Sequence, residues 1–220
     1  MIKKMPIFIL LIISASAAII CSYLNYFRIF LWLKPLTTIL IIISAFQIGK
    51  PEKSLYTKAI ISGLVFCLLG DVLLLNDQFF IYGLISFLIA HLIFTYSFIK
   101  IGGFSSNYIH AVVLLIIGIL YYAFLYKSLG QLAIPVLLYL LVILLMCWQG
   151  LSFECKSSEV HGRFVHVAVI LFVISDATLA YNKFIVSSDS SPLLILGTYW
   201  TSLFMLALST QCNISNRRLV

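Results

Sequence analysis

Long apolar runs, separated by short polar interruptions, extend along almost the whole chain. Each run lasts roughly 20 residues, the length that an α-helix needs to cross a hydrocarbon core about 30 Å thick. The runs are too long for barrel strands, and lipid offers no partners to the backbone of an open sheet. The pattern therefore predicts an all-α integral membrane protein, a bundle of eight transmembrane helices at about 6–27, 29–48, 57–76, 78–99, 106–126, 131–149, 162–182 and 192–212.

The connections between these runs are short, so we expect residues 1–220 to form a single transmembrane domain. Asn76 and Asp77 predict a tight turn, 101–106 a small loop, and 187–192 is the most loop-like stretch. Any chemistry is therefore expected inside the bundle or at its edge.

Composition supports a membrane protein and excludes a soluble domain. Hydrophobic residues make up 63% of the chain and charged residues only 10%. The 14 Lys and Arg residues exceed the 7 Asp and Glu residues, which gives a formal net charge of +7. In a membrane protein such an excess usually sets orientation, so we expect no nucleic-acid partner. No obligate protein partner is evident either.

The basic residues predict which way the bundle faces. Ten of them fall on the side of the two termini: Lys3, Lys4, Lys50, Lys53, Lys58, Lys100, Lys156, Arg163, Arg217 and Arg218. The other side holds Arg28, Lys127 and Lys183, with Lys34 somewhat inside a helix. Because Lys and Arg concentrate in cytoplasmic loops, we expect both termini in the cytoplasm and a multi-pass protein of a bacterial inner membrane.

The cysteines and the N-terminus call for two further expectations. No CxxC pair and no zinc-ligand spacing is present, so we predict that all cysteines are reduced and structural: Cys21, Cys67, Cys147, Cys155 and Cys212. The N-terminal apolar run resembles a signal peptide with a small-residue site at 15–17. It continues well past that site, and we therefore expect it to be retained as the first helix.

Two aspartates lie at membrane depth, Asp71 in the apolar stretch 60–75 and Asp176 in the stretch 164–181. A charge at that depth costs roughly 2.5–3.5 kcal/mol even on lenient insertion scales, so such residues normally face a wet interior and are functional. We expect the rest of the chain to hold both carboxyls against one cavity. The structural alternative is an ion pair with Lys34.

Counting along the predicted helices at about 1.5 Å per residue places polar side chains of five helices in one layer, in the outer half of the bundle. They are Lys34, Asp71, Tyr139, Asp176 and Tyr199, with His91 nearer the midplane. Each has a plainer interpretation: a snorkelling lysine, a hydrogen-bonded core histidine, or packing tyrosines. Small residues on two of these helices would allow close helix approach, namely Gly63, Gly70 and Gly83.

Motifs at these positions resemble a known family in order and spacing. The motifs are 34–38 (KPLTT), 63–74 with Gly70-Asp71, 83–91 (GLISFLIAH) followed by Tyr96, 135–139 (PVLLY) and 172–180 (FVISDATLA). They are similar to those of the YhhN-like lysoplasmalogenases, eight-helix membrane hydrolases, over residues ~34–203. The last helix departs from the family's Tyr-Tyr-x-Ala-Gln, because Leu203 stands at the glutamine position.

The resemblance implies hydrolysis of the vinyl ether bond of lysoplasmalogens, which are lysophospholipids. The products of this hydrolysis would be a fatty aldehyde and a glycerophospho-alcohol. Protonation of the vinyl β-carbon gives an oxocarbenium ion that water attacks, so the site needs one protonated carboxyl and one carboxylate. We expect Asp71 and Asp176 to be this catalytic pair, in either order. Substrate-binding residues would be Lys34, His91, Tyr139 and Tyr199, with Lys34 tuning the carboxylate or binding phosphate. No metal and no cofactor are expected.

Three other classes of function stay open. A small-solute or ion-coupled transporter would bind a cation or proton at the aspartates and show flux without aldehyde. A metal-dependent membrane lipid hydrolase would use Asp71, His91 and Asp176 as ligands and respond to chelators. A non-catalytic lipid-binding protein would tolerate replacement of both carboxylates.

Overall fold

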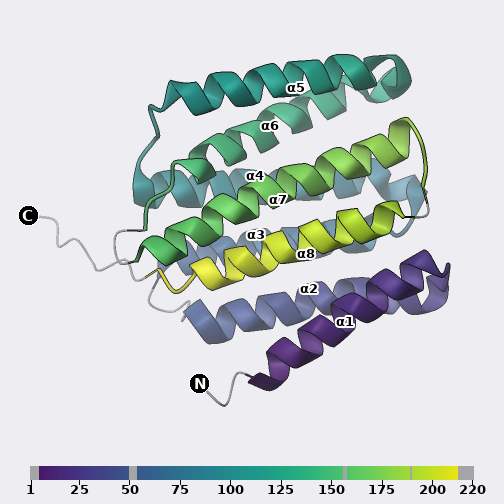
Figure 1. Cartoon of the computed structure of the whole chain (residues 1–220), viewed down its shortest axis with the longest axis horizontal. Coiled ribbons are helices and arrows are strands. Elements are labelled where there is room, and N and C mark those ends of the chain that lie inside the picture. The colour runs from purple at the N-terminus through teal and green to yellow at the C-terminus, as the bar shows by residue number, and fades with distance from the viewer. Residues whose placement is uncertain (1–4, 50–53, 156–157, 189, 213–220) are drawn as a thin grey trace, which may run out of the picture.

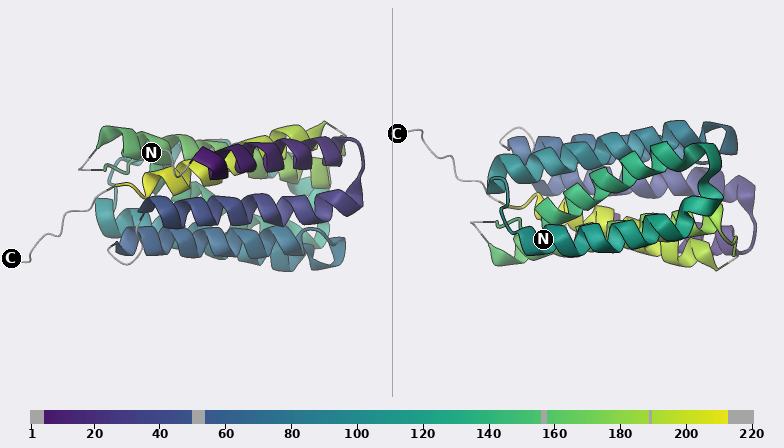
Figure 2. Two further views of the ribbon diagram at one scale, coloured as in Figure 1. Left: turned by 90° about the horizontal axis from the view of Figure 1, so that it is seen from below. Right: turned by 90° about the horizontal axis from the view of Figure 1, so that it is seen from above.

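In the computed structural model, residues 5–49, 54–155, 158–188 and 190–212 are described, and they form a bundle of α-helices that run along one common direction (Figures 1 and 2). The helices are α1 (Met5–Tyr23), α2 (Phe27–Gly49), α3 (Leu55–Leu73), α4 (Phe80–Gly102), α5 (Tyr108–Leu129), α6 (Ala133–Leu151), α7 (Glu159–Phe184) and α8 (Ser191–Ser209). Two one-turn 3-10 helices lie in the connections, η3 (Asp77–Phe79) and η4 (Gly130–Leu132). These described residues contain no strand.

The all-helical membrane prediction is confirmed. Seven segments within the described residues are long and apolar enough to cross a membrane. One of them, Tyr108–Leu151, has 44 residues and contains both α5 and α6, which turn back at η4 and lie side by side (Figure 1). A span count of eight stays a prediction, whereas a multi-pass integral membrane protein is supported.

The predicted helix limits differ from the observed ones by no more than four residues. The largest difference is at the end of α1, predicted at residue 27 and observed at Tyr23. Asn25 follows with a φ of 59°, a left-handed conformation that asparagine tolerates better than most residues. The turn predicted at Asn76 and Asp77 is present, because the Asn76 side chain accepts a hydrogen bond from the Gln78 N–H at 3.0 Å.

Glycines on α3 allow α4 to pack against it at short range, as expected from the sequence. A Cβ at Gly70 would lie 2.6 Å from a ring carbon of Phe87, and one at Gly63 would lie 2.2 Å from the ring of Phe94. Both distances are below any normal carbon–carbon contact. The two α4 rings therefore occupy the space that larger α3 side chains would need.

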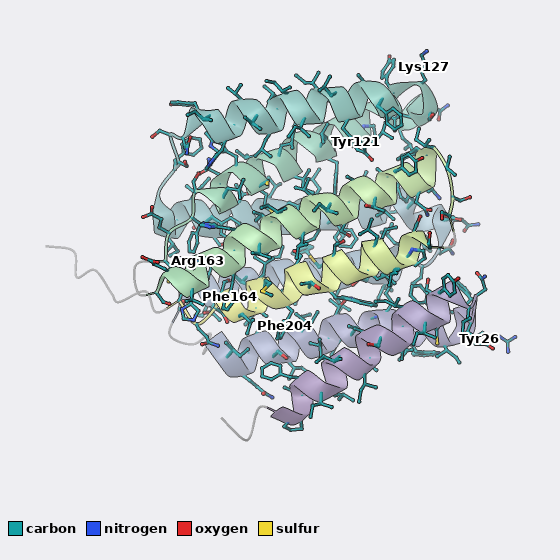
Figure 3. All side chains as sticks on the ribbon, in the orientation of Figure 1. Tyr26, Tyr121, Lys127, Arg163, Phe164 and Phe204 are labelled. Atoms are coloured by element: carbon teal, nitrogen blue, oxygen red, sulfur yellow. A yellow bond between two sulfur atoms is a disulfide. The ribbon has the colours of Figure 1, made fainter. Side chains whose placement is uncertain are left out.

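The helix ends separate the described basic residues into two groups. α1 begins and α8 ends at the same end of the bundle (Figure 1), and Figure 3 shows Arg163 and Lys127 at opposite ends. The predicted side of the termini is represented by Lys58, Lys100 and Arg163. The remaining members of that group lie outside the described residues: Lys3, Lys4, Lys50, Lys53, Lys156, Arg217 and Arg218. Which end faces the cytoplasm stays a prediction.

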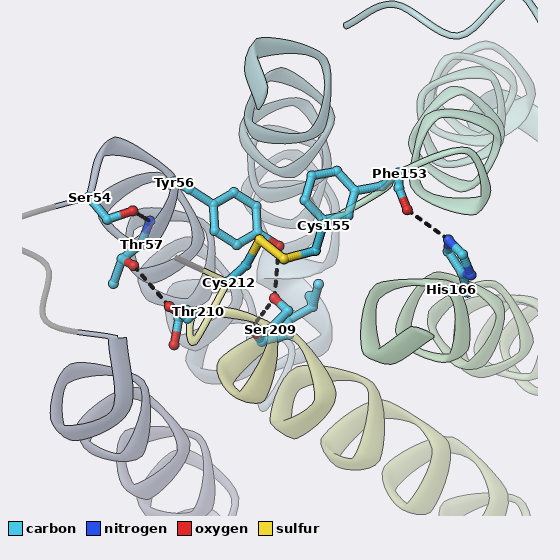
Figure 4. Close-up of a disulfide and its surroundings, with 10 residues drawn as sticks. Ser54, Tyr56, Thr57, Phe153, Cys155, His166, Ser209, Thr210 and Cys212 are labelled. Atoms are coloured by element: carbon cyan, nitrogen blue, oxygen red, sulfur yellow. Dashed lines mark hydrogen bonds between the residues drawn. A yellow bond between two sulfur atoms is a disulfide. The ribbon is translucent and has the colours of Figure 1, made fainter. Parts of the chain in front are cut away.

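The prediction that all cysteines are reduced is wrong for two of them, because Cys155 and Cys212 form a disulfide (Figure 4). They are 57 residues apart in sequence, and only the folded bundle brings the segment after α6 to the end of α8. Of the other three, Cys67 and Cys147 are buried and Cys21 is partly buried. Disulfides persist mainly in oxidising compartments, whereas the basic residues assign this end to the cytoplasm.

Candidate functional site

Asp71 is held by side chains of two other helices, α2 and α8. Its Oδ2 accepts hydrogen bonds from the Thr38 hydroxyl at 2.6 Å and the Tyr199 hydroxyl at 2.9 Å. Its Oδ1 lies 3.5 Å from Nζ of Lys34. Lys34 and Thr38 are one helical turn apart and therefore face the same side of α2. Asp71 is buried, and its carboxylate is supplied with donors on both oxygens.

The structure selects between the interpretations of Lys34. The side chain is buried and its ammonium faces Asp71, so it does not snorkel to the membrane surface. Thr38 and Trp200 also belong to this cluster, although neither was predicted to have a role; the Trp200 indole N–H donates to the Thr38 hydroxyl at 3.2 Å. A signal for Thr38 was present, namely its spacing of four residues from Lys34.

Asp176 belongs to a second cluster, formed with residues of α6 and α4. The Tyr139 hydroxyl donates a short hydrogen bond to Oδ2 of Asp176, and Nε2 of His91 lies 3.9 Å from the same oxygen. His91 is completely buried, and within the described residues neither of its ring nitrogens has a hydrogen-bond partner. It is a buried imidazole poised beside a carboxyl.

Aromatic rings connect the two clusters. The His91 ring packs edge-on against Phe172, with 4.6 Å between centroids, and Phe172 packs against Tyr199 at 5.6 Å. Tyr139 also packs against His91, with 5.3 Å between the ring centroids. The structure thus brings the six predicted site residues into two neighbouring clusters joined through Phe172. No role was predicted for Phe172 from the sequence.

A cavity of about 190 Å³ lies between α4, α5, α6 and α7. Asp176 and Tyr139 line it, together with Tyr121 and Tyr122 of α5. The rest of the wall is apolar: Leu74, Phe80, Leu84, Phe87, Ile117, Gly118, Leu125, Val136, Leu140, Ile143, Leu144, Val173, Ala177, Leu179, Ala180 and Phe184. Asp71 is not part of this wall, so the cavity is lined by one of the two aspartates and not, as we expected, by both.

The alternative metal site is not assembled. In the portion of the chain that the structure describes, no group of three or more His, Cys, Asp or Glu side chains is placed to hold a metal ion. Of the three ligands considered, Asp71 belongs to the Lys34 cluster, while His91 and Asp176 lie in the other. The donor set therefore fits hydrogen bonding and proton transfer better than metal ligation.

Comparisons with known proteins place these residues in a wider context. The model of the YhhN family matches residues 29–210. The chain is 30% identical to lysoplasmalogenase TMEM86A of Bos taurus over 154 residues and 30% identical to lysoplasmalogenase TMEM86B of Rattus norvegicus over 155 residues, covering 67% and 70% of this chain. It is 31% identical to the Homo sapiens TMEM86A over 154 residues, covering 67% of this chain. The alignments cover 62% of the length of each of these relatives. No solved structure matches.

Proposed function

The chain belongs to the YhhN family, and we propose that it is a membrane hydrolase that cleaves the vinyl ether bond of lysoplasmalogens. The products would be a fatty aldehyde and a glycerophospho-alcohol. Relatives named lysoplasmalogenases support the substrate class. The observation that carries the proposal is that Asp176 lines an otherwise largely apolar cavity, while its carboxyl accepts a hydrogen bond from Tyr139.

Asp176 is assigned as the acid. An apolar wall accommodates a neutral carboxyl at lower cost than an ionised one. The Tyr139 hydroxyl occupies Oδ2, which leaves Oδ1 to carry the proton. Transfer of that proton to the vinyl β-carbon uses the C=C electron pair to form the new C–H bond. An oxocarbenium ion and an Asp176 carboxylate result.

The same residue serves as the base in the next step. The Asp176 carboxylate lies beside the cation it has created and stabilises it electrostatically. Water attacks the cationic carbon, and Asp176 accepts a proton from that water. The hemiacetal then expels the glycerol oxygen, which takes the proton from Asp176, while the hemiacetal hydroxyl gives its own proton back to Asp176 as the aldehyde forms. One water is consumed, and Asp176 ends the cycle protonated.

Asp71 is assigned as the permanent carboxylate of the pair. Its donors, Lys34, Thr38 and Tyr199, favour its ionised form. Because Asp71 does not line the cavity, we treat it as a positioning residue. It orients Tyr199, which packs on Phe172 and through that ring supports His91 beside Asp176.

The test is aldehyde release from a 1-alkenyl lysophospholipid by the detergent-purified full chain. General acid–base groups typically contribute about 10²–10⁴-fold, so Asp176→Asn should lower kcat by at least about 100-fold. Glu159→Gln is the matched control, because Glu159 is exposed and pairs with Arg163 in the first turns of α7, far along the helix from Asp176. A folded Asp176→Asn variant with the wild-type rate would exclude this mechanism.

A further inference from the structure

A pair of opposite charges lies beside Phe80, a residue of the cavity wall. Asp77 in η3 and Lys183 in the last turn of α7 form an ion pair, with 2.5 Å between Nζ and Oδ1. The Lys183 side chain is 36% exposed and that of Asp77 is 90% exposed. The two residues come from segments far apart in the sequence and meet at the end of the bundle opposite α8's last turn.

This charge pair adjoins the cavity through two rings. Nζ of Lys183 lies 5.1 Å from the centroid of the Phe80 ring, a distance at which a cation is attracted to an aromatic face. The Phe80 ring meets the Phe184 ring at 6.1 Å in a T-shaped arrangement. Both Phe80 and Phe184 line the cavity, so the ammonium lies against a residue that borders the space that would hold the lipid.

Lys183 can bind an additional anion, whereas Lys34 cannot. Lys34 is buried, its ammonium faces Asp71, and it lies outside the cavity wall. Lys183 has three N–H donors and a partly exposed side chain, and an exposed ion pair of this kind holds its partners only weakly. It can therefore keep Asp77 and still donate to a phosphate, while Asp77 retains an oxygen for a cation.

The spacing along α7 fits the substrate. Asp176 and Lys183 are seven residues apart, which places them on the same face of the helix, about 10.5 Å apart along its axis. Ala180, also in the wall, lies between them and presents only a methyl group. In a lysoplasmalogen the vinyl β-carbon and the phosphorus are joined by seven bonds of about 1.5 Å each, which reach roughly 9 Å when extended.

We propose that Asp77 and Lys183 form the head-group site for a zwitterionic phospho-amine lipid. Lys183 binds the phosphate and Asp77 binds the amine, with the vinyl ether at Asp176 and the hydrocarbon chain directed toward Ile143 and Leu144, on the far side of Asp176 from Lys183. This inference rests on the proposed function and adds a substrate preference to it.

The kinetic test compares two vinyl ether substrates, a 1-alkenyl-glycerophosphoethanolamine and a 1-alkenyl-glycerol that lacks the phosphate. Lys183→Met should raise KM for the phospholipid about tenfold or more, as expected for a lost charge-assisted contact. It should leave kcat, and both constants for the alkenyl-glycerol, nearly unchanged. Asp77→Asn should raise KM for the phosphoethanolamine lipid but not for the corresponding 1-alkenyl-glycerophosphate.

Lys127→Met is the matched control, because Lys127 is an exposed lysine in the last turn of α5 at the same end of the bundle. This variant should leave KM unchanged for both substrates. If Lys183→Met leaves KM for the phospholipid unchanged, or changes KM equally for both substrates, the head-group assignment is wrong.

Binding of a non-cleavable 1-alkyl lysophosphoethanolamine separates this inference from the proposed function. Its dissociation constant, measured by calorimetry, should rise at least about tenfold in Lys183→Met and stay constant in Lys127→Met. Lys183-dependent binding without aldehyde release from the alkenyl lipid would support the head-group site and overturn the hydrolytic function. Aldehyde release together with binding that does not depend on Lys183 would support the hydrolytic function and overturn the head-group site.

Discussion

Lys34 and Asp71 carry opposite charges inside the bundle, 3.5 Å apart and both buried. Counting along the helices predicted their common depth, because a helix rises by a constant amount per residue. It did not predict that the hydroxyls of Thr38 and Tyr199 would donate hydrogen bonds to Asp71. Which neighbours a carboxylate meets depends on how three helices are rotated about their own axes, and their sequences do not encode that rotation locally.

The ion pair leads to a stability prediction. Asp71→Asn leaves the Lys34 ammonium buried without a counter-charge, which should cost about 3–5 kcal/mol of unfolding free energy. The double variant Lys34→Met with Asp71→Asn removes both charges and should recover most of that loss. Thermal unfolding in detergent measures both effects.

The exposed ion pair of Asp77 and Lys183 provides a matched comparison for the buried one. Asp77→Asn removes the counter-charge of Lys183 at a site open to solvent, where an unpaired ammonium stays hydrated. Its melting temperature should match that of the wild type. A single Asp71→Asn variant that also melts like the wild type would show that the Lys34–Asp71 pair does not form.

Among the secondary-structure elements, α3 and α4 depend most clearly on residue size. Gly70 stands where the Phe87 ring crosses α3, and that ring also packs against Tyr199 with 5.8 Å between centroids. Enlarging Gly70 would therefore displace a ring that touches the Asp71 cluster. Apolar runs predicted these helices well, whereas the packing of one helix on another required three-dimensional contacts.

The prediction at this scale concerns Gly70→Ala. The added Cβ would lie 2.6 Å from Phe87, and overpacking of this kind typically costs about 1–3 kcal/mol. Combination with Phe87→Leu should restore part of the loss by removing the ring. Gly197→Ala on α8 is the control, because nothing lies within 4 Å of its Cβ position, and it should melt no lower than the wild type. Equal melting temperatures for both alanine variants would contradict the packing.

For the molecule as a whole, two observations disagree about orientation. The basic residues assign the end with Lys58, Lys100 and Arg163 to the cytoplasm, yet the Cys155–Cys212 disulfide lies at this same end. Cytosolic thiols are normally kept reduced. The basic residues act during insertion, before the two cysteines can meet, so we predict that this end faces the cytoplasm.

The resulting prediction is tested by labelling intact cells with a membrane-impermeant thiol reagent, in a variant whose native cysteines are replaced. Ser128→Cys, exposed in the last turn of α5, should react from outside. Ser106→Cys, exposed in the loop after α4, should react only after permeabilisation. The opposite pattern would place the disulfide outside and reverse the orientation.

The disulfide itself should stabilise the purified, oxidised protein. Joining residues 57 apart restricts the unfolded chain, which by the chain-entropy model contributes up to about 4 kcal/mol. A reductant should therefore lower the melting temperature of the wild type but not that of Cys155→Ser. Equal sensitivity of the two proteins to the reductant would rule this contribution out.

By itself the sequence determined that this protein lies in a membrane and is built of helices, because twenty-residue apolar runs have no stable alternative to helices in lipid. It also singled out Asp71 and Asp176, since charges at that depth are too costly to be incidental. Only the tertiary structure decided that Lys34 faces Asp71, that the cavity adjoins Asp176, and that Cys155 meets Cys212. Those contacts join residues distant in the chain, and they follow from helix rotation and packing, which no local pattern records.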